Sequence, residues 1–190
     1  MAELLRTLFH GRHAKLGATL VEFGGWEMPV QYPAGIVQEH LATRRRSGLF
    51  DVSHMGRFRV AGGDAPAFLQ HVLTNNAAAL SVGEAQYTMI PDARGGAMDD
   101  AYLYRFSPDE FLLVVNASNR QKDWDHLNAA ARGFRSVKLT DRTCEVAMLS
   151  LQGPEARGTL ERILESGRLP EPLRNRLSIA AFNGAPLLLA

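Results

Sequence analysis

Cysteine is almost absent from this sequence, which has one, Cys144, in 190 residues. A single thiol excludes an internal disulfide, so we expect a reducing compartment: the cytoplasm, or the mitochondrial matrix in a eukaryote. Cys144 lies in an apolar run with Val146 and Met148. This run predicts a strand over 144–151 and a small buried side chain in preference to a nucleophile.

The sequence also lacks an excess of charge of either sign. Lys and Arg total 21 against 20 Asp and Glu, for a formal net charge of +1. This balance predicts neither a nucleic-acid partner nor a membrane surface, and no apolar run reaches spanning length. The basic run Arg44 to Arg46 is typical of a solvated helix end, with docking of an acidic carrier protein as the weaker alternative. Residues 1–15 lack the continuous hydrophobic stretch of a signal peptide.

Motifs for metal binding and common catalytic chemistry are missing as well. The 6 histidines are dispersed, and no paired Cys or His-Glu-x-x-His pattern occurs. There is no Gly-x-Ser-x-Gly, and Ser53-His54 has no obvious orienting acid. Gly24-Gly25 and Gly95-Gly96 match no phosphate-binding loop and predict turns. We therefore expect no metal.

Helical and strand periodicities are mixed along the chain, whose 46% hydrophobic content can supply a core. Helices are predicted over 36–47, 65–73, 119–131 and 156–164, with Asp64 capping the second and Ser118 or Asn119 capping the third. Strands are predicted over 49–52, 57–61, 86–90, 100–106, 111–115 and 137–139, besides 144–151. The strands between 86 and 115 are consecutive and predict a meander. This order indicates an α+β fold with largely antiparallel sheets and packed helices.

The segment from Gly95 to Phe106 is the most informative. Asp is depleted in strands, yet Asp99 and Asp100 lead directly into one. Alternation places Asp100, Tyr102 and Tyr104 on one face, with Asp99 on the other. A carboxylate with two phenols suits a cavity for a flat polar molecule, although spacing alone favours a strand edge that faces water.

Two further stretches, Phe23 to Tyr32 and Asp51 to Gly56, mix aromatics, glycine and charge in a way that linkers do not. We interpret Trp26 as a core residue in preference to a stacking platform. His54 is interpreted as a hydrogen-bonded structural histidine. For Met55 we give equal weight to two interpretations, a packing residue and a ligand contact.

These stretches together resemble a known family, the T-proteins of the glycine cleavage system, which are tetrahydrofolate-dependent aminomethyltransferases. The matching motifs are Phe23-Gly24-Gly25-Trp26-Glu27-Met28-Pro29, Gly48-Leu49-Phe50-Asp51-Val52-Ser53-His54-Met55-Gly56, Leu73-Thr74-Asn75, Gly95-Gly96-Ala97-Met98-Asp99-Asp100, Val114-Val115-Asn116-Ala117 and Leu151-Gln152-Gly153-Pro154. The resemblance is dense over 15–154 and loose beyond.

The resemblance implies a reaction, two partners and a site. The family transfers the aminomethyl group carried on the lipoyl arm of H-protein to tetrahydrofolate, its cosubstrate, and releases ammonia. The second Asp of the Gly-Gly-x-x-Asp-Asp motif is the key catalytic and folate-binding acid, which here is Asp100. The other folate contacts correspond by motif to Met55, Tyr87, Tyr104 and Asn116. Orientation and electrostatic stabilisation is the role we expect of Asp100, with general-base action left open.

Family members continue past Ala190 into further folate contacts and a C-terminal barrel domain. The resemblance therefore implies that residues 1–190 are an N-terminal part of the folate-binding region, with a candidate subdomain break near 50–56. The apolar run 186–190 is interpreted as a strand cut before its continuation, with a buried terminal strand as the alternative. A cut edge would leave the piece inactive and prone to self-association.

Other functions stay open from the sequence. One is the folate domain of a sarcosine or dimethylglycine oxidase, or a folate-binding repair protein for iron-sulfur enzymes. Another is an inactive binding fragment that folds by pairing with its own copy. The motifs at Trp26-Glu27-Met28-Pro29 and Asp51 to Gly56 favour the T-protein family, although oxidase-type domains have related versions.

Overall fold

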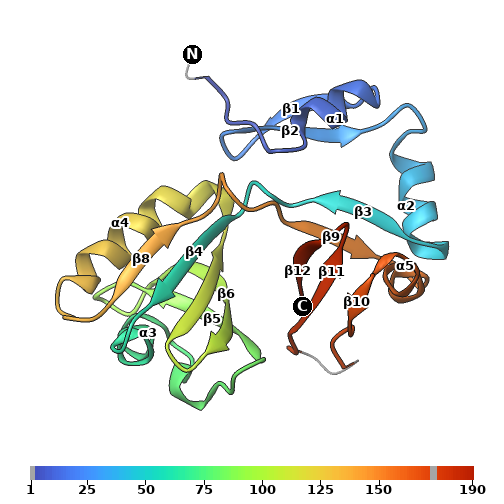
Figure 1. Cartoon of the computed structure of the whole chain (residues 1–190). Helices are drawn as coiled ribbons and strands as arrows, with labels where there is room; N and C mark the ends of the chain where they lie inside the picture. Colours follow the sequence, from blue (N-terminus) through green and yellow to red (C-terminus); the bar gives the residue numbers. More distant parts are fainter. Residues whose placement is uncertain (1–2, 172–174) are drawn as a thin grey trace. The chain divides into compact units, whose positions relative to one another are not determined.

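Antiparallel pairing joins the strands of every sheet in the computed structural model, which describes residues 3–171 and 175–190 (Figure 1). The helices are α1 (His10–Lys15), α2 (Ile36–Arg45), α3 (Ala65–Val72), α4 (Arg120–Ala131) and α5 (Ala156–Ile163), with short 3-10 helices η1 (Ala77–Ala79) and η2 (Ala117–Asn119). The strands are β1 (Thr19–Phe23), β2 (Trp26–Gln31), β3 (Gly48–Asp51), β4 (Gly56–Ala61), β5 (Ala85–Pro91), β6 (Ala97–Ser107), β7 (Glu110–Val115), β8 (Lys138–Asp141), β9 (Leu149–Gln152), β10 (Ser166–Gly167), β11 (Ser178–Phe182) and β12 (Ala185–Leu189). The predicted α+β class with antiparallel sheets is confirmed.

The chain divides into two units by its internal contacts. The first unit contains the described residues up to His54 together with Thr143–Leu164, and the second contains Met55–Arg142 together with the described residues from Glu165 onward. The chain therefore passes from the first unit to the second between His54 and Met55, inside the interval 50–56.

The second unit is built on a five-stranded sheet in the order β5-β6-β7-β4-β8. The predicted meander is present as β5, β6 and β7, in which Met89 is paired with Asp100 and Tyr102 with Val114. Gly95 closes the β5–β6 loop with a positive φ of 83°. Asp92 stabilises the same loop, because its Oδ1 accepts hydrogen bonds of 2.8 Å from the amides of Arg94 and Gly96.

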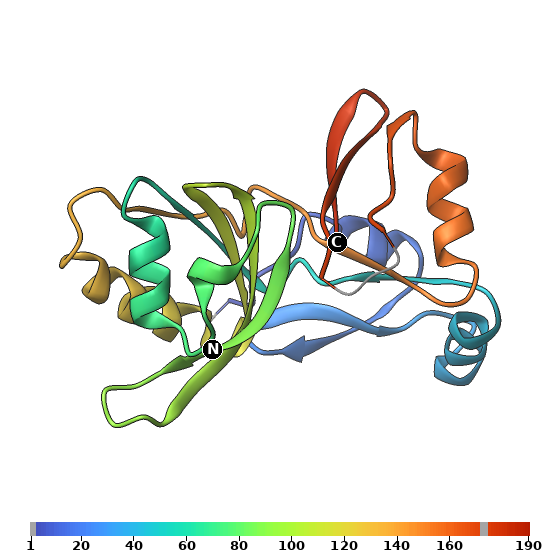
Figure 2. The same ribbon diagram turned by 90° about the horizontal axis from the view of Figure 1, so that it is seen from below.

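Helices α3 and α4 cover one face of this sheet (Figure 2). Their apolar side chains pack with the inward-facing residues of the strands. The fully buried members of this core include Phe58, Val60, Phe68, Leu69, Ile90, Leu103, Phe111, Leu113, Val115 and Leu127. Because side chains alternate along β6, Ala101 and Leu103 enter the core while Asp100, Tyr102 and Tyr104 lie on the face away from the helices.

The first unit contains a hairpin, β1–β2, that the periodicity did not predict as strands. Gly24 and Gly25 form its turn with φ values of 58° and 85°, which confirms the prediction of turn glycines. Trp26 is buried, as expected of a core residue. The ring of His54 meets Phe23 edge to face, with 5.5 Å between the ring centroids.

A buried polar cluster ties α1 to β3 and to Tyr32, the residue that follows β2, within this unit. Nε2 of His13 lies 2.9 Å from Oδ2 of Asp51, and Nδ1 of His13 lies 2.8 Å from the hydroxyl of Tyr32. The hydroxyl of Thr7 also donates to Asp51 Oδ2, at 2.6 Å. Burial raises the pKa of Asp51, but hydrogen bonds from His13, Ser53 and Thr7 more than offset this and hold it below its ordinary value.

The predicted strand over 144–151 is wrong in its extent. β9 covers only Leu149–Gln152, because its partner β3 offers just Gly48–Asp51 for pairing. Met148, before β9, is instead held by Ser53, whose Oγ accepts from the Met148 amide at 2.9 Å and donates to its carbonyl at 3.1 Å. Cys144 lies in the turn that precedes this point and is exposed, so the prediction of a buried thiol is also wrong.

Two predicted local features differ in detail. Asp64 precedes α3, but its Oδ2 accepts from the amides of Arg135 and Ser136, at 3.1 and 2.9 Å, in place of an amide of its own helix. The apolar run 186–190 contributes to β12, which is paired with β11. Leu188 in β12 is exposed, so this strand is paired without being buried. Among the described residues, no helix is both long and apolar enough to cross a membrane.

Candidate functional site

Asp100 is an exposed carboxylate whose two oxygens each accept a hydrogen bond. The hydroxyl of Tyr87 donates to Oδ2 at 3.0 Å, and the side-chain amide of Asn116 donates to Oδ1 at 2.7 Å. An ionised carboxylate has about four lone-pair sites, so two such bonds fix its orientation and leave acceptor capacity for a ligand. Three of the predicted site residues are thus brought into direct contact.

Strand pairing explains why these side chains meet. Tyr87 on β5 is paired with Tyr102 on β6, which makes Tyr87 the diagonal neighbour of Asp100 on the same face. Asn116 follows the last residue of β7, Val115, which is paired with Ala101. The meander alone therefore places a phenol and an amide on either side of one carboxylate.

Tyrosine rings continue this face of the sheet beyond Asp100. The ring centroids of Tyr87 and Tyr102 are 6.4 Å apart, and those of Tyr102 and Tyr104 are 5.3 Å apart. The hydroxyl of Tyr102 donates to the side-chain oxygen of Asn175. Tyr104, a predicted site residue, is linked to the Asp100 group through the Tyr102 ring.

Two phenols of this face, those of Tyr87 and Tyr104, have raised pKa values. The hydrogen bond to Asp100 is the main cause that raises the pKa of Tyr87. Burial, followed by the neighbouring Tyr102, raises the pKa of Tyr104 to about 12. The surface consequently places neutral phenols and aromatic rings beside a single carboxylate.

Asp99 points to the opposite face and is buried. It accepts hydrogen bonds from the backbone amide of Asn116 at 3.2 Å, from Asn116 Nδ2 at 2.9 Å and from Asn119 Nδ2 at 2.9 Å. Burial raises its pKa, but the bonds from Asn116, Asp123 and Asn119 outweigh burial and lower it overall. Asp99 therefore holds the strand ends together from the core side.

Asn119 and Asp123 were not predicted from the sequence as part of this group. They are separated by four residues, so they lie on one face of the helical segment that contains α4. That spacing, directly after the Asn116 motif, is the signal that could have identified them.

Met55 lies apart from the hydrogen-bonded group. It is half-buried and directly precedes β4, whose first residue, Gly56, is paired with Val115. Met55 and Asn116 are thus at the same end of two paired strands. The carbonyl of Met55 accepts from Arg57 Nη1 at 2.6 Å, which holds the backbone at this point.

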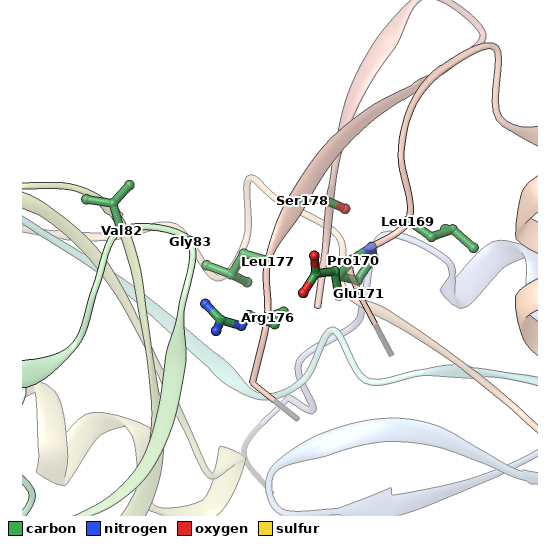
Figure 3. Close-up of a pocket in the computed structure, with 8 residues that line it drawn as sticks. All are labelled: Val82, Gly83, Leu169, Pro170, Glu171, Arg176, Leu177 and Ser178. Carbon is green, nitrogen blue, oxygen red and sulfur yellow. The ribbon is translucent and has the colours of Figure 1, made fainter. Parts of the chain in front are cut away.

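An open hollow of about 520 Å³ lies elsewhere in the second unit, lined by Val82, Gly83, Leu169, Pro170, Glu171, Arg176, Leu177 and Ser178 (Figure 3). None of the predicted site residues lines it. Arg176, its cationic residue, is paired with Glu84 at 2.6 Å. We therefore place the candidate site at Asp100.

Among the described residues, no group of three or more His, Cys, Asp or Glu side chains could hold a metal ion.

Comparison with known proteins decides the family. Residues 9–171 match the family described as the GCVT N-terminal domain. The chain belongs to this family. The resemblance inferred from the motifs is confirmed.

The relatives of this GCVT N-terminal domain include named enzymes. It is 48% identical over 185 residues to an aminomethyltransferase of Thermus thermophilus, an alignment that covers 97% of the chain and 52% of the relative. It is 51% identical over 158 residues to the aminomethyltransferase of Deinococcus deserti, in an alignment that covers 83% of the chain and 44% of the relative. The chain spans about half the length of the curated relatives it matches.

The chain also resembles two solved structures. The glycine cleavage system aminomethyltransferase T of Bartonella henselae matches with a TM-score of 0.81 and 35% identity, over 93% of the chain and 50% of that protein. A heterotetrameric sarcosine oxidase of Corynebacterium sp. U-96 matches with a TM-score of 0.55 and 20% identity, over 80% of the chain and 75% of that protein. The second likeness shows a shared fold alone.

Proposed function

We propose that this chain provides the folate site of an aminomethyltransferase of the glycine cleavage system. Such an enzyme moves the one-carbon unit of an aminomethyl group on lipoylated H-protein to tetrahydrofolate and releases ammonia. The observation that carries the proposal is the exposed Asp100 of the Gly-Gly-x-x-Asp-Asp motif, fixed by Tyr87 and Asn116, in a chain of this family.

The residues around Asp100 suit a reduced pterin. The free acceptor sites of the carboxylate can receive the N–H donors of the pterin ring, which is flat and polar. Tyr87, Tyr102 and Tyr104 supply aromatic surface along one face beside it. Asn116 retains a side-chain oxygen that can accept from the same ring edge, while its Nδ2 is engaged with Asp99 and Asp100.

Orientation and electrostatic stabilisation is the role we assign to Asp100. As ammonia departs, positive charge develops on the carbon that is being transferred. A carboxylate fixed in advance by two hydrogen bonds stabilises that charge without having to reorganise. The same carboxylate holds the attacking N–H group in place, and water can carry the released proton away.

The test is a pair of measurements on the chain and its Asp100→Asn variant. Calorimetric titration with tetrahydrofolate measures binding, and ammonia release from aminomethylated H-protein measures transfer. We expect Asp100→Asn to weaken folate binding by at least about tenfold, the size of one lost charge-assisted hydrogen bond, and to abolish folate-dependent transfer. Asp109→Asn, on the exposed β6–β7 turn, is the matched control and should change neither.

Near-normal transfer by Asp100→Asn would overturn the proposal. Capture of formaldehyde by bound tetrahydrofolate, without lipoyl-dependent ammonia release, would instead identify an oxidase-type folate domain. The greater identity to aminomethyltransferases, 48% against 20% for the sarcosine oxidase, favours the transferase. Light scattering during the titration separates a folate-binding monomer from a fragment that only pairs with its own copy.

A further inference from the structure

Asp123 is a titratable group for which the proposed transfer has no direct use. It lies in α4 and is fully buried, with 0% of its surface exposed. Within the described residues, neither of its carboxylate oxygens receives an N–H or hydroxyl donor. The side chain that its carboxyl group interacts with is another carboxyl group, that of Asp99 on β6, and this interaction raises the pKa of Asp123.

Two carboxyl groups form a hydrogen bond only when one of them carries a proton. Asp99 already accepts three bonds from the amides of Asn116 and Asn119, which stabilise its ionised form. The proton therefore belongs to Asp123. Burial, and then the contact with Asp99, raises the pKa of Asp123 to about 7, which agrees with this assignment.

Asp99 also connects Asp123 to the candidate site. Asn116 Nδ2 donates to Asp99 Oδ1 at 2.9 Å and to Asp100 Oδ1 at 2.7 Å. An amide nitrogen has two hydrogens, so one serves each acid. The position of Asp99 consequently determines where the Asn116 amide holds Asp100.

We propose that Asp123, in its protonated form, is a positioning residue for Asp100. It donates to Asp99, which orients the Asn116 amide, which in turn fixes the Asp100 carboxylate. The link to folate binding rests on the proposed function, whereas the chain of hydrogen bonds does not.

The charged groups around Asp123 do not provide a substitute for this proton. Lys122, its neighbour in α4, lowers the Asp123 pKa by its charge, but its ammonium group donates to the carbonyl of Met98 at 2.7 Å. Arg120, one turn earlier, is paired with Asp141 of β8 at 3.7 Å. Loss of the Asp123 proton would thus place a second negative charge against Asp99, and the Asn116 amide would have to respond.

Nuclear magnetic resonance of the 190-residue chain tests the proposed series of hydrogen bonds without any ligand. The carboxyl carbon of Asp123 and the side-chain amide of Asn116 are followed across neutral pH. We expect the Asn116 signals to shift with the midpoint of Asp123, and the shift to vanish in Asp123→Asn. Asp125→Asn, an exposed acid on the same helix, should leave it unchanged. Asn116 signals that stay fixed while Asp123 titrates, or an Asp123 ionised throughout, would overturn the proposal.

Tetrahydrofolate titration gives the functional result. Asp123→Asn supplies an amide donor to Asp99, so its affinity for tetrahydrofolate at neutral pH should remain within about twofold of that of the original chain. In the original chain the affinity should decline as Asp123 ionises, and this decline should be absent in Asp123→Asn. Asp123→Ala removes the donor and should bind about tenfold more weakly. Equal pH profiles for the original chain and Asp123→Asn would contradict a positioning role.

The two proposals can fail separately. Should Asp100→Asn bind folate normally while Asn116 still follows Asp123, the proposed function is wrong and the positioning chain stands. Should Asp100→Asn lose folate binding while the Asn116 signals do not follow the titration of Asp123, the proposed function stands and the positioning role is wrong.

Discussion

Asp99 and Asp100 are adjacent in sequence and have opposite surroundings. Strand alternation sends Asp99 to the helix-covered face, where amides of Asn116 and Asn119 bind it, and Asp100 to the exposed face, where it retains acceptor capacity. Asn116 bridges the pair, since its side-chain amide donates to both. One acid therefore holds the strand ends in place, and the other is available to a ligand.

Asp123 should make stability fall as pH rises, in contrast to the usual behaviour of a paired Asp. Its pKa is raised in the folded state to about 7 from an ordinary 3.8, so the neutral form is the stabilised one. The contribution of Asp123 to stability is complete at pH values below the ordinary pKa of 3.8. It declines between this pH and about 7, and it is lost at higher pH. At roughly 1.4 kcal/mol per pKa unit, the loss amounts to a few kcal/mol.

Urea unfolding at several pH values within and on either side of that interval measures the effect. Asp123→Asn cannot ionise, so its free energy of unfolding, relative to that of the original chain, should increase through the interval. Asp125→Asn, on the exposed side of the same helix, is expected to keep the original pH dependence. Parallel profiles for the original chain and Asp123→Asn would show that Asp123 does not titrate there.

Individual side chains were predictable where one periodicity decided their direction. Alternation assigned Asp99 and Asp100 to their faces correctly, but it gave Tyr102 the same standing as Tyr104, which the family motifs do not. Asn119 and Asp123 were missed despite their spacing after the Asn116 motif, because a polar pair in a helix ordinarily faces water. Only the three-dimensional approach of α4 to the β6–β7 strand ends turns this pair inward.

Among the elements, the strands of the central meander were predicted well, whereas the β1–β2 hairpin was not predicted. The β5–β6–β7 meander follows from three consecutive strand-like runs and two turns, including one closed by Asp92 and Gly95. β9 was predicted too long because its partner β3 is about 100 residues away in the chain, and a strand extends only as far as its partner. Periodicity contains no information about that distant pairing.

The cluster of His13 and Asp51 should hold α1 against the rest of the first unit. Both side chains are buried, and Asp51 has a pKa lowered by hydrogen bonds from His13, Ser53 and Thr7 against the opposing effect of burial. A lowered carboxyl pKa stabilises the fold above its ordinary value, and this stability is lost as pH falls through the folded value. Acid should therefore release this helix only at pH values below the ordinary Asp51 pKa of 3.8.

His13→Ala should make the attachment of α1 more sensitive to acid. Removal of one partner of a buried carboxylate costs about 1–3 kcal/mol, so we expect faster hydrogen exchange over 10–16 and an acid transition that begins at higher pH. His40→Ala, an exposed histidine of α2 in the same unit, is the control. Unchanged exchange over 10–16 in His13→Ala would show that the cluster does not hold the helix.

For the molecule as a whole, the α+β class and the family were readable from the sequence, but the division into units was not. The segment Thr143–Leu164 returns to the first unit after the whole meander has formed, which no local pattern signals. The predicted break near 50–56 concerned one crossing of the chain, whereas a second crossing follows Arg142 and a third follows Leu164.

Burial is distributed unevenly between the units, which predicts uneven stability. Among the described residues of the first unit, the buried hydrophobic side chains are those of Trp26 and Met28, while Val37 and Leu49 there are 69% and 63% exposed. The second unit contains the large core around Leu103. Hydrophobic burial is the dominant favourable term in folding, so amides of the first unit should open at lower free energy.

Native-state hydrogen exchange, resolved by residue, measures this difference directly. We expect amides of β4 to β7 to exchange with the highest opening free energies and amides of β1 to β3 with lower ones. Leu103→Ala leaves a cavity in the second unit and should lower its protection by about 2–5 kcal/mol while leaving protection in β1 to β3 unchanged. Phe23→Ala, which truncates an exposed side chain, should change neither set by a comparable amount. Equal opening free energies throughout, or a Leu103→Ala effect spread over both units, would mean that the chain unfolds as one cooperative body in spite of its uneven core.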